Sequence, residues 1–357
     1  MKSWPAYLVV VLVFGAAVYS FSHRPLPPFA PTEIHPDKLL VNGLARAGTH
    51  YVAAGELGHI LIADSADGPW REAAVTPARG STFTRVAFIN DKVGLAVGHD
   101  GWIVRSADGG ENWKEVAFDE QRPDALIGVA GPFDGKLYAY GAFGLFLASI
   151  DEGLTWQPEP LNIVDPNKKA KPKPVVDPNA DPFANFSEQS DSQADRHLNG
   201  MLQLADGALM LVGERGLVLV SRDKGASWQP IDSGYTGSYY GGLALAEGKV
   251  LLYGMRGNAY LTADGGGTWQ KAEVPVQVSL FSGAVLPGGG IVLVGDNNAL
   301  LLSNDQGASF TVAAQAEHRG LAAGLSEVLV LPDGGLLAAG DGGISRHAVA
   351  GAAGGKP

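Results

Sequence analysis

The sequence predicts an all-β fold, a seven-bladed β-propeller with four-stranded antiparallel blades, preceded by an N-terminal membrane segment. Two repeated features predict the propeller. The phrase Ser/Thr-x-Asp-x-Gly-x-x-Trp/Phe occurs five times, with a shortened copy before them at 65–70. A Gly-x-x-Gly turn, in two copies with a looser ending, recurs at intervals of 43, 43, 72, 41, 41 and 45 residues. A period near 40 built of short strands and glycine-bounded turns is typical of propeller blades.

Each Asp phrase is expected to form a hairpin turn. The short Asp side chain accepts hydrogen bonds from its own turn, glycine supplies a positive φ, and the aromatic residue packs at the start of the next strand. Trp113 is therefore expected to be buried between blades. Because every blade needs this turn, we interpret the following residues as structural: Asp108, Trp113, Asp151, Trp156, Asp223, Trp228, Asp264, Trp269, Asp305 and Phe310.

The strands are placed by alternating or apolar runs between these turns. The ranges expected for units one to three are 51–54 and 59–63, then 83–89, 94–97 and 102–106, then 126–130, 136–140 and 145–149. Units four to six are expected to begin near Met201, Leu243 and Gly283, and the last unit spans 328–349. Because the last unit lacks a full Asp phrase, residues 34–40 are expected to supply its missing strand.

The chain divides at its ends and at one insertion. Residues 1–22 are predicted to be a signal anchor or a signal peptide, 23–33 a proline-rich spacer, 34–349 the propeller and 350–357 a flexible tail. The uncharged stretch 5–21 has the minimal length for crossing a bilayer. An uncleaved anchor would leave the propeller in the periplasm, attached to the inner membrane. The 157–196 insertion is proline-rich, which predicts a loop, either a solvated excursion or a partner-docking arm.

Composition excludes several functions. A net charge of −11 argues against nucleic acid, whose phosphates require a basic surface. The chain has no cysteine, which rules out disulfides, thiolate metal sites and a cysteine nucleophile. Calcium loops need closely spaced acidic residues in one segment, and none occurs. We therefore expect neither a metal nor a cofactor.

Strand alternation predicts which face binds. In a four-stranded meander the Asp turns lie on one face of the ring, and the Gly-x-x-Gly turns lie on the other. Dissimilar side chains crowd the second face, as at the ligand-binding mouth of a propeller. Arg215 and Arg256, from neighbouring units, are expected to form a positive pair suited to a carboxylate. The full set of candidate binding residues is Arg85, His99, Asp100, Phe143, Arg215, Tyr239, Tyr240, Arg256, Asp296 and Asn297.

The stretch from Leu95 to Trp113, LAVGHDGWIVRSADGGENW, resembles the repeat of the photosystem II assembly/stability factor family. That family consists of seven-bladed propellers with Asp-box repeats of the bacterial neuraminidase type. The resemblance covers about residues 40–345 and implies a non-catalytic, monomeric assembly scaffold. The acidic balance and the insertion indicate a member from a non-photosynthetic bacterium. For such members the resemblance implies a membrane-protein client, including exporters of the resistance-nodulation-division type.

A sialidase-like glycoside hydrolase or a glycan-binding propeller is the alternative, since sialidases carry the same turn motif. A sialidase would need an Arg-Ile-Pro phrase, which is absent, and three arginines that converge on a carboxylate. Arg85, Arg215 and Arg256 are the candidates, beside Tyr239 or Tyr240. No pair of carboxylates at a fixed separation is evident from the sequence. We therefore predict a protein without enzymatic activity.

Overall fold

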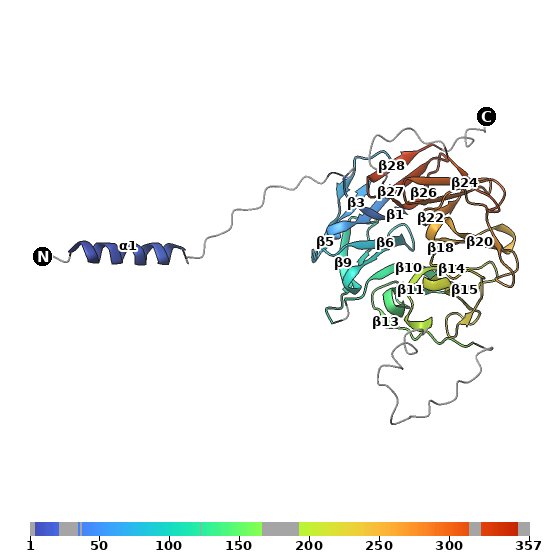
Figure 1. Cartoon of the computed structure of the whole chain (residues 1–357), viewed down its shortest axis with the longest axis horizontal. Helices are drawn as coiled ribbons and strands as arrows, with labels where there is room; N and C mark the ends of the chain where they lie inside the picture. Colours follow the sequence, from blue (N-terminus) through green and yellow to red (C-terminus); the bar gives the residue numbers. More distant parts are fainter. Residues whose placement is uncertain are drawn as a thin grey trace, which may run out of the picture. The chain divides into compact units, whose positions relative to one another are not determined.

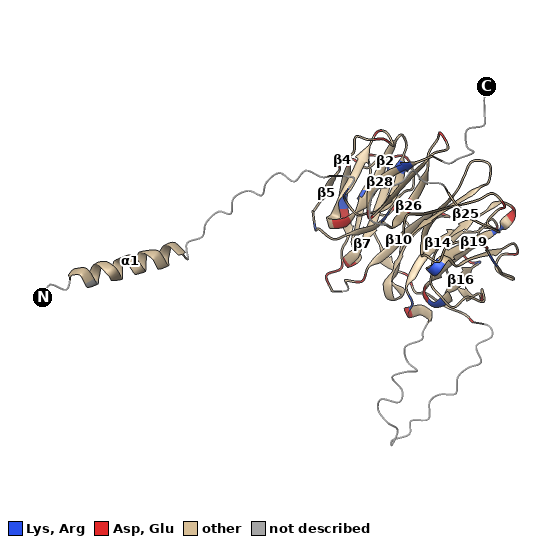
Figure 2. Cartoon of the chain, turned by 45° about the horizontal axis from the view of Figure 1, so that its top comes forward, with Lys and Arg blue, Asp and Glu red and all other residues tan. Residues whose placement is uncertain are grey.

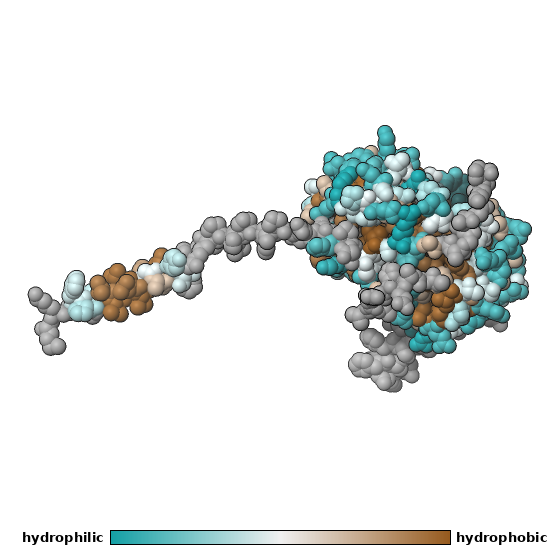
Figure 3. Space-filling view, turned by 90° about the horizontal axis from the view of Figure 1, so that it is seen from above, coloured by the Kyte–Doolittle hydropathy of each residue, from teal (hydrophilic) through white to brown (hydrophobic). Residues whose placement is uncertain are grey.

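A computed structural model of the chain describes residues 4–20, 35, 38–121, 123–165, 193–313 and 323–348. The chain forms two compact units, Met1–Ile34 and His35–Pro357. The first contains α1 (Trp4–Ser20), which has no charged residue in its sequence. Its side chains, including Leu12 and Phe14, are exposed and apolar (Figure 3). Among the described residues, no helix combines the length and the apolar character needed to cross a membrane.

The second unit is a seven-bladed propeller whose blades are antiparallel meanders (Figure 1). In the described residues six sheets have their strands in chain order, and in the sheet of blade 2 the extra strand β5 pairs in parallel with β9 at the outer edge. Blade 1 consists of β1 (Val41–Ala47), β2 (His50–Gly55), β3 (Ile60–Ala63) and β4 (Arg71–Glu72); blade 2 of β6 (Phe83–Phe88), β7 (Gly94–Gly98), β8 (Ile103–Ser106) and β9 (Asn112–Ala117), joined by β5 (Ala74–Thr76); blade 3 of β10 (Leu126–Phe133), β11 (Lys136–Gly141), β12 (Phe146–Ser149) and β13 (Gln157–Pro158).

The remaining blades follow the same order. Blade 4 consists of β14 (Leu198–Gln203), β15 (Leu209–Gly213), β16 (Val218–Ser221) and β17 (Gln229–Pro230); blade 5 of β18 (Tyr239–Ala244), β19 (Val250–Gly254), β20 (Ala259–Thr262) and β21 (Gln270–Lys271); blade 6 of β22 (Leu280–Val285), β23 (Ile291–Gly295), β24 (Ala299–Ser303) and β25 (Thr311–Val312); blade 7 of β26 (Leu325–Val330), β27 (Leu336–Gly340) and β28 (Gly343–His347). The predicted propeller is confirmed, although the first strands of blades 4 to 7 begin about three residues earlier than expected.

The first strand of each blade lies at the centre of the ring, and each packs on the first strand of the next blade (Figure 1). The middle strands are buried on both faces. For example, Tyr51 to Gly55 of β2 and all four residues of β3 are buried. Such strands have a continuous apolar sequence because both faces contact neighbouring blades. The hydrophobic core therefore lies between the blades rather than within a single sheet.

In the described residues, the predicted closing strand from 34–40 is not seen. Blade 7 has three strands in the described residues, and Lys38 to Leu40 form a turn and coil. Ile34, Pro36 and Asp37 lie outside the described residues. Closure comes from packing of β1 against β26 and β27. Arg346 of β28 also pairs with Asp67 of blade 1, at 2.5 Å, and with Asp333 of blade 7, so its guanidinium joins the two ends of the ring.

The Asp phrases form the predicted turns. In the second blade the Ser106 hydroxyl donates to the Asp108 carboxylate at 2.8 Å, and the same carboxylate accepts from the Asn112 backbone at 3.0 Å. The indole Nε1 of Trp113 donates to the Gly110 carbonyl at 2.9 Å. Gly110 has a φ of 99°, a conformation that glycine adopts without strain. The turn thus satisfies its own backbone and fixes the indole between blades.

These turns predict an acid limit to stability. Side-chain and backbone hydrogen bonds from Thr155, Ser227 and Thr268 lower the pKa of Asp151, Asp223 and Asp264 to about 2. Because the folded pKa lies below the ordinary 3.8, the stabilisation is complete above about pH 4 and is lost as the pH falls towards 2. The melting temperature should therefore decrease over this window. An Asp223→Asn variant should show a shallower decrease, and equal slopes would contradict the role of the carboxylate.

Candidate binding site at the mouth of the channel

The Gly-x-x-Gly turns form 3₁₀ turns between the second and third strands of five blades. These turns are η1 (Glu56–Gly58), η2 (His99–Gly101), η3 (Ala142–Gly144), η5 (Glu214–Gly216) and η7 (Met255–Gly257). Two further 3₁₀ turns occur in the described residues, η4 (Gln193–Asp195) in the insertion and η6 (Ala246–Gly248) in blade 5. Since the Asp turns connect the third and fourth strands, the two sets of turns lie at opposite faces of the ring. We call the face that carries the Gly-x-x-Gly turns the Gly-x-x-Gly face.

The second variable residue of each of these five turns, and of the looser turn in blade 6, has a left-handed backbone. The φ values in blades 1 to 6 are 54° for Leu57, 60° for Asp100, 51° for Phe143, 55° for Arg215, 56° for Arg256 and 56° for Asn297. This conformation costs an ordinary L-residue about 1–2 kcal/mol, whereas Asn and Asp adopt it more easily. Leu57, Phe143, Arg215 and Arg256 are also exposed. The face therefore displays four large side chains on strained backbone.

A cavity of about 350 Å³ opens among the first strands. In every first strand the pairing register shifts after the first residue, which leaves the second residue as a β-bulge. All seven bulge residues line the cavity. We call them the collar: Asn42, Thr84, Ile127, Asn199, Tyr240, Phe281 and Ser326. One local irregularity, repeated in each blade, thus builds one site.

Three polar collar residues connect neighbouring blades. The Asn42 amide donates to the Phe83 carbonyl at 2.8 Å, and Asn199 donates to Tyr239 in the same way at 2.8 Å. The Thr84 hydroxyl lies 2.7 Å from the Leu126 carbonyl of the next blade. In blades 3, 5 and 6 the collar residues are instead Ile127, Tyr240 and Phe281, respectively. The Tyr240 and Phe281 rings are 5.4 Å apart and form an apolar wall, while Ile127 is separated from them by Asn199 of blade 4.

A charged pair lies across the channel beside the collar. Arg85 of blade 2 forms an ion pair with the buried carboxylate of Glu327 in blade 7, which also accepts a hydrogen bond from Ser282 of blade 6. Burial raises the pKa of Tyr253, in blade 5, to about 12, and the nearby Arg85 opposes this shift. Burial likewise raises the pKa of Tyr140 in blade 3. The Arg85 guanidinium therefore acts on residues from several blades, as expected for a side chain near the ring axis.

The structure brings together three of the ten predicted binding residues. Arg85, His99 and Tyr240 line the cavity. The others, except Tyr239, lie in the turns or turn ends of this face without lining the cavity: Asp100, Phe143, Arg215, Arg256, Asp296 and Asn297. Asp100 accepts a 2.5 Å hydrogen bond from Ser81, and the Phe143 ring packs edge-on against His197 at 4.8 Å.

The assignment of Tyr239 to the binding site is wrong. Its side chain is fully buried between blades, and its hydroxyl donates to Ser233 at 2.8 Å. Burial raises the pKa of this phenol above its ordinary value. Tyr239 is the first residue of β18 and pairs regularly with β19, and its side chain faces the core. Tyr240, the next residue, is the bulge, and its side chain faces the channel. It is a structural residue.

Sequence reasoning missed most of the collar. Its members share a position that is visible in the sequence: each lies 14 residues before the first glycine of its Gly-x-x-Gly turn, or 13 in blade 1. Each also follows a buried residue and, except in blade 2 where Arg85 comes next, precedes a buried one, as in Leu198-Asn199-Gly200. Counting back from the glycines would have found Asn42, Thr84, Ile127, Asn199, Phe281 and Ser326.

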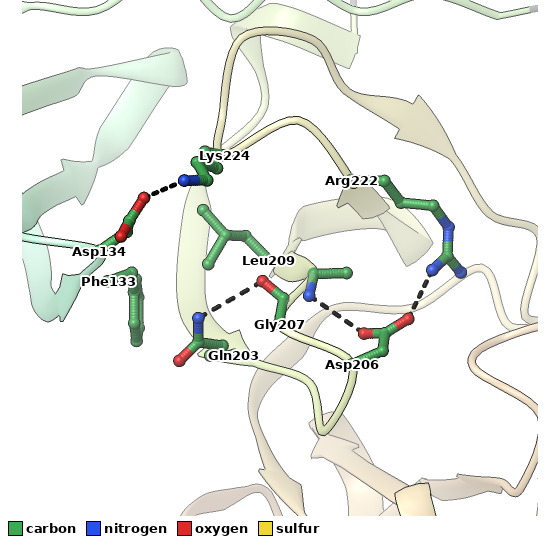
Figure 4. A pocket seen from close by; sticks show the side chains of 9 residues that line it. Phe133, Asp134, Gln203, Asp206, Gly207, Leu209, Arg222 and Lys224 are labelled. Atoms are coloured by element: carbon green, nitrogen blue, oxygen red, sulfur yellow. Dashed lines mark hydrogen bonds and ion pairs between the residues drawn. The ribbon is translucent and has the colours of Figure 1, made fainter.

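A second cavity, of about 570 Å³, lies between blades 3 and 4 on the side of the Asp turns (Figure 4). Phe133 and Leu209 supply its apolar surface. Lys224 pairs with Asp134, and Arg222 pairs with Asp206 at 2.6 Å. These four charges neutralise one another in pairs across the opening. The groove therefore presents no net charge to a ligand.

The arrangement does not resemble the sialidase-like alternative. Of the three candidate arginines, Arg85 lines the cavity and is engaged by Glu327, while Arg215 and Arg256 do not line it. Within the described ranges no three His, Asp or Glu side chains are grouped so as to hold a metal ion. Residues 166–192, which include the second Val-Asp-Pro-Asn phrase of the insertion, lie outside the described residues.

Comparison with known proteins gives the fold. No protein-family model and no curated protein matches the chain. Among solved structures it is similar to YCF48 bound to a D1 peptide, with 16% identity over 91% of this chain and 97% of that chain and a TM-score of 0.65. It is also similar to YCF48 from Cyanidioschyzon merolae, with 13% identity, 88% and 97% coverage and a TM-score of 0.64. The WD40 propeller of Doa1 follows, with 10% identity, 87% and 92% coverage and a TM-score of 0.61. At these identities the likeness shows a common propeller fold.

Proposed function

We propose that this protein is a non-catalytic binding scaffold that holds a protein partner on its Gly-x-x-Gly face. The observation that carries the proposal is the collar: seven blades converge on one open cavity, and the turns around it display large exposed side chains. Strained backbone persists where the surrounding structure fixes it, and such strain is common at binding sites. The opposite face consists of repeated turns whose polar groups bond to one another.

The likeness to a propeller solved with a bound peptide supports a protein partner. YCF48, a photosystem II assembly factor, was captured with a peptide of D1. The sequence of the present chain resembles the repeat of that family. We therefore propose the scaffold role for this protein, but not the photosynthetic partner. A membrane protein, such as an exporter of the resistance-nodulation-division type, is the client that the family resemblance implies for a non-photosynthetic bacterium.

Two arginines on this face suit an acidic segment of the partner. Arg215 and Arg256 occupy equivalent positions in neighbouring blades, on a chain with a net charge of −11. Both are exposed. Figure 2 shows Lys and Arg interspersed with Asp and Glu around the propeller. A planar guanidinium binds a carboxylate through two parallel hydrogen bonds, so two such groups form a suitable contact.

We further propose that residues 5–21 attach the protein to the inner membrane, with the propeller in the periplasm. The support is the uncharged, apolar sequence of α1. Membrane fractionation of the native protein tests this proposal. Recovery of the full-length chain in the membrane pellet supports it, while a soluble mature form that begins after Ser20 or Ser22 contradicts it.

The scaffold proposal predicts that Arg215→Glu with Arg256→Glu abolishes capture of the partner from detergent-solubilised membranes and leaves the melting temperature within a few degrees of the parent. The control is Lys92→Glu with Lys271→Glu, which changes the net charge equally at exposed positions away from this face. Arg222 and Lys224 are unsuitable controls because both hold ion pairs. Mass spectrometry of the bound proteins is the measurement. Equal losses in both double variants would show that net charge, not the face, governs binding.

A further inference from the structure

We propose that the collar cavity receives one uncharged aromatic side chain of the partner, which anchors it to the Gly-x-x-Gly face. This inference rests on the proposed scaffold function and specifies the chemistry of its central contact. Three of the four polar collar residues are already engaged, because the donors of Asn42, Thr84 and Asn199 bond to backbone carbonyls of the next blades. The largest apolar surface left for a ligand is the wall of Tyr240 and Phe281, with Ile127 further round the collar; Ser326, His99 and Arg85 complete the lining.

The apolar collar residues have no evident structural purpose. Ile127, Tyr240 and Phe281 are partly exposed, whereas the residues just before them in each strand are fully buried. Blades 1, 2 and 4 place a hydrogen-bonding residue at the same position, so the fold does not require an apolar group there. Large apolar side chains around a concave opening are the usual lining of ligand pockets. We infer that blades 3, 5 and 6 carry them for binding.

The charges near the cavity exclude an ionised anchor. Arg85 and Glu327 already compensate each other across the channel. A carboxylate of the partner would approach the buried Glu327, and an ammonium group would approach Arg85, so neither sign of charge gains a net partner. A neutral ring avoids both costs. It also packs edge-to-face on aromatic residues and lies favourably beside a guanidinium group.

The size of the cavity fits a single anchor. A volume of about 350 Å³ is at the lower end of the range for small-ligand pockets. One aromatic side chain with part of its backbone fills such a space, whereas a folded element does not enter it. Interfaces commonly concentrate their binding energy in one or two such anchors, which are often Trp or Tyr. The Arg215–Arg256 region would then form part of the polar surroundings of the anchor.

The test uses saturation-transfer NMR with the purified full-length protein and four probes: N-acetyl-tyrosinamide, N-acetyl-phenylalaninamide, N-acetyl-glutamic acid amide and methyl β-glucoside. The two aromatic probes should give ring-proton signals that saturate in the millimolar range. Tyr240→Ala with Phe281→Ala should reduce these signals at least tenfold. Val312→Ala, at an exposed position of β25 that does not line the cavity, should leave them unchanged. Tyr240→Leu with Phe281→Leu, which keeps most of the apolar volume, should retain folding and give an intermediate signal.

Three results would overturn the inference: no signal from the aromatic probes, equal signals in wild type and both double variants, or a stronger signal from the acidic probe or the glucoside. The scaffold proposal fails separately, if the wild-type protein captures no partner from solubilised membranes. If the protein captures a partner but binds neither aromatic probe, the scaffold proposal stands and the proposal of an aromatic anchor is wrong.

Discussion

Replacement of Trp113 by alanine should lower the free energy of unfolding by about 3–5 kcal/mol, the usual cost of deleting a large buried aromatic side chain. Trp113 is 1% exposed. Its ring packs edge-on against Phe88, with the ring centroids 5.8 Å apart, and its indole donates to Gly110. The strand β5, which follows the last strand of blade 1, also pairs in parallel with β9, and its Val75 lies opposite Trp113. The variant therefore loses contacts within blade 2 and between blades 1 and 2.

Urea unfolding monitored by circular dichroism measures this loss. Trp156→Ala is the matched control, because it removes the same residue of the same turn in blade 3, where the indole is only partly buried. We expect the control to lose less than half as much stability. If the two variants are equally stable, Trp113 does not occupy the position between blades that the fold assigns to it.

Glu327→Gln should cost about 3 kcal/mol, because it leaves Arg85 without its counter-charge in the channel. The carboxylate is 9% exposed and the guanidinium 29%, so solvent compensates for the loss only in part. Removal of both charges together is expected to be much less harmful, since a buried ion pair often contributes little beyond the desolvation of its two groups. Arg85→Met with Glu327→Met should therefore regain most of the lost stability.

A thermodynamic cycle over Arg85→Met, Glu327→Met and the double variant checks this expectation. The coupling between positions 85 and 327 should exceed about 1 kcal/mol, as for residues in one charged network. Additive effects of the two single changes would mean that Arg85 does not depend on Glu327. The proposed electrostatic compensation in the channel would then be wrong.

The blades were predictable because their signals are local. An Asp phrase such as Ser106–Trp113 makes its hydrogen bonds within itself, and a Gly-x-x-Gly turn needs only its own glycines. Their spacing along the chain therefore gave the number of blades. The burial of Trp113 was also predictable, since a large aromatic residue at a repeated strand start has no other place to pack.

The collar was less predictable because it depends on register between strands. A β-bulge is a relation between two strands, and a shift by one residue reverses the face on which a side chain lies. This is why Tyr239 was placed in the site together with Tyr240. Ring closure was missed for a related reason: whether a blade borrows a strand depends on contacts between distant ends of the chain. Here Arg346, Asp67 and Asp333 join those ends.

Site-specific photo-crosslinking tests most directly which face binds the partner. Phe143 and Glu152 belong to the same blade, both are exposed, and both have left-handed backbones, with φ of 51° and 58°. They lie on opposite faces, in a Gly-x-x-Gly turn and an Asp turn respectively. With p-benzoylphenylalanine at either position, the scaffold account predicts adducts with a partner in membranes from position 143 and background levels from position 152. Adducts from position 152 alone would contradict the assignment of the binding face.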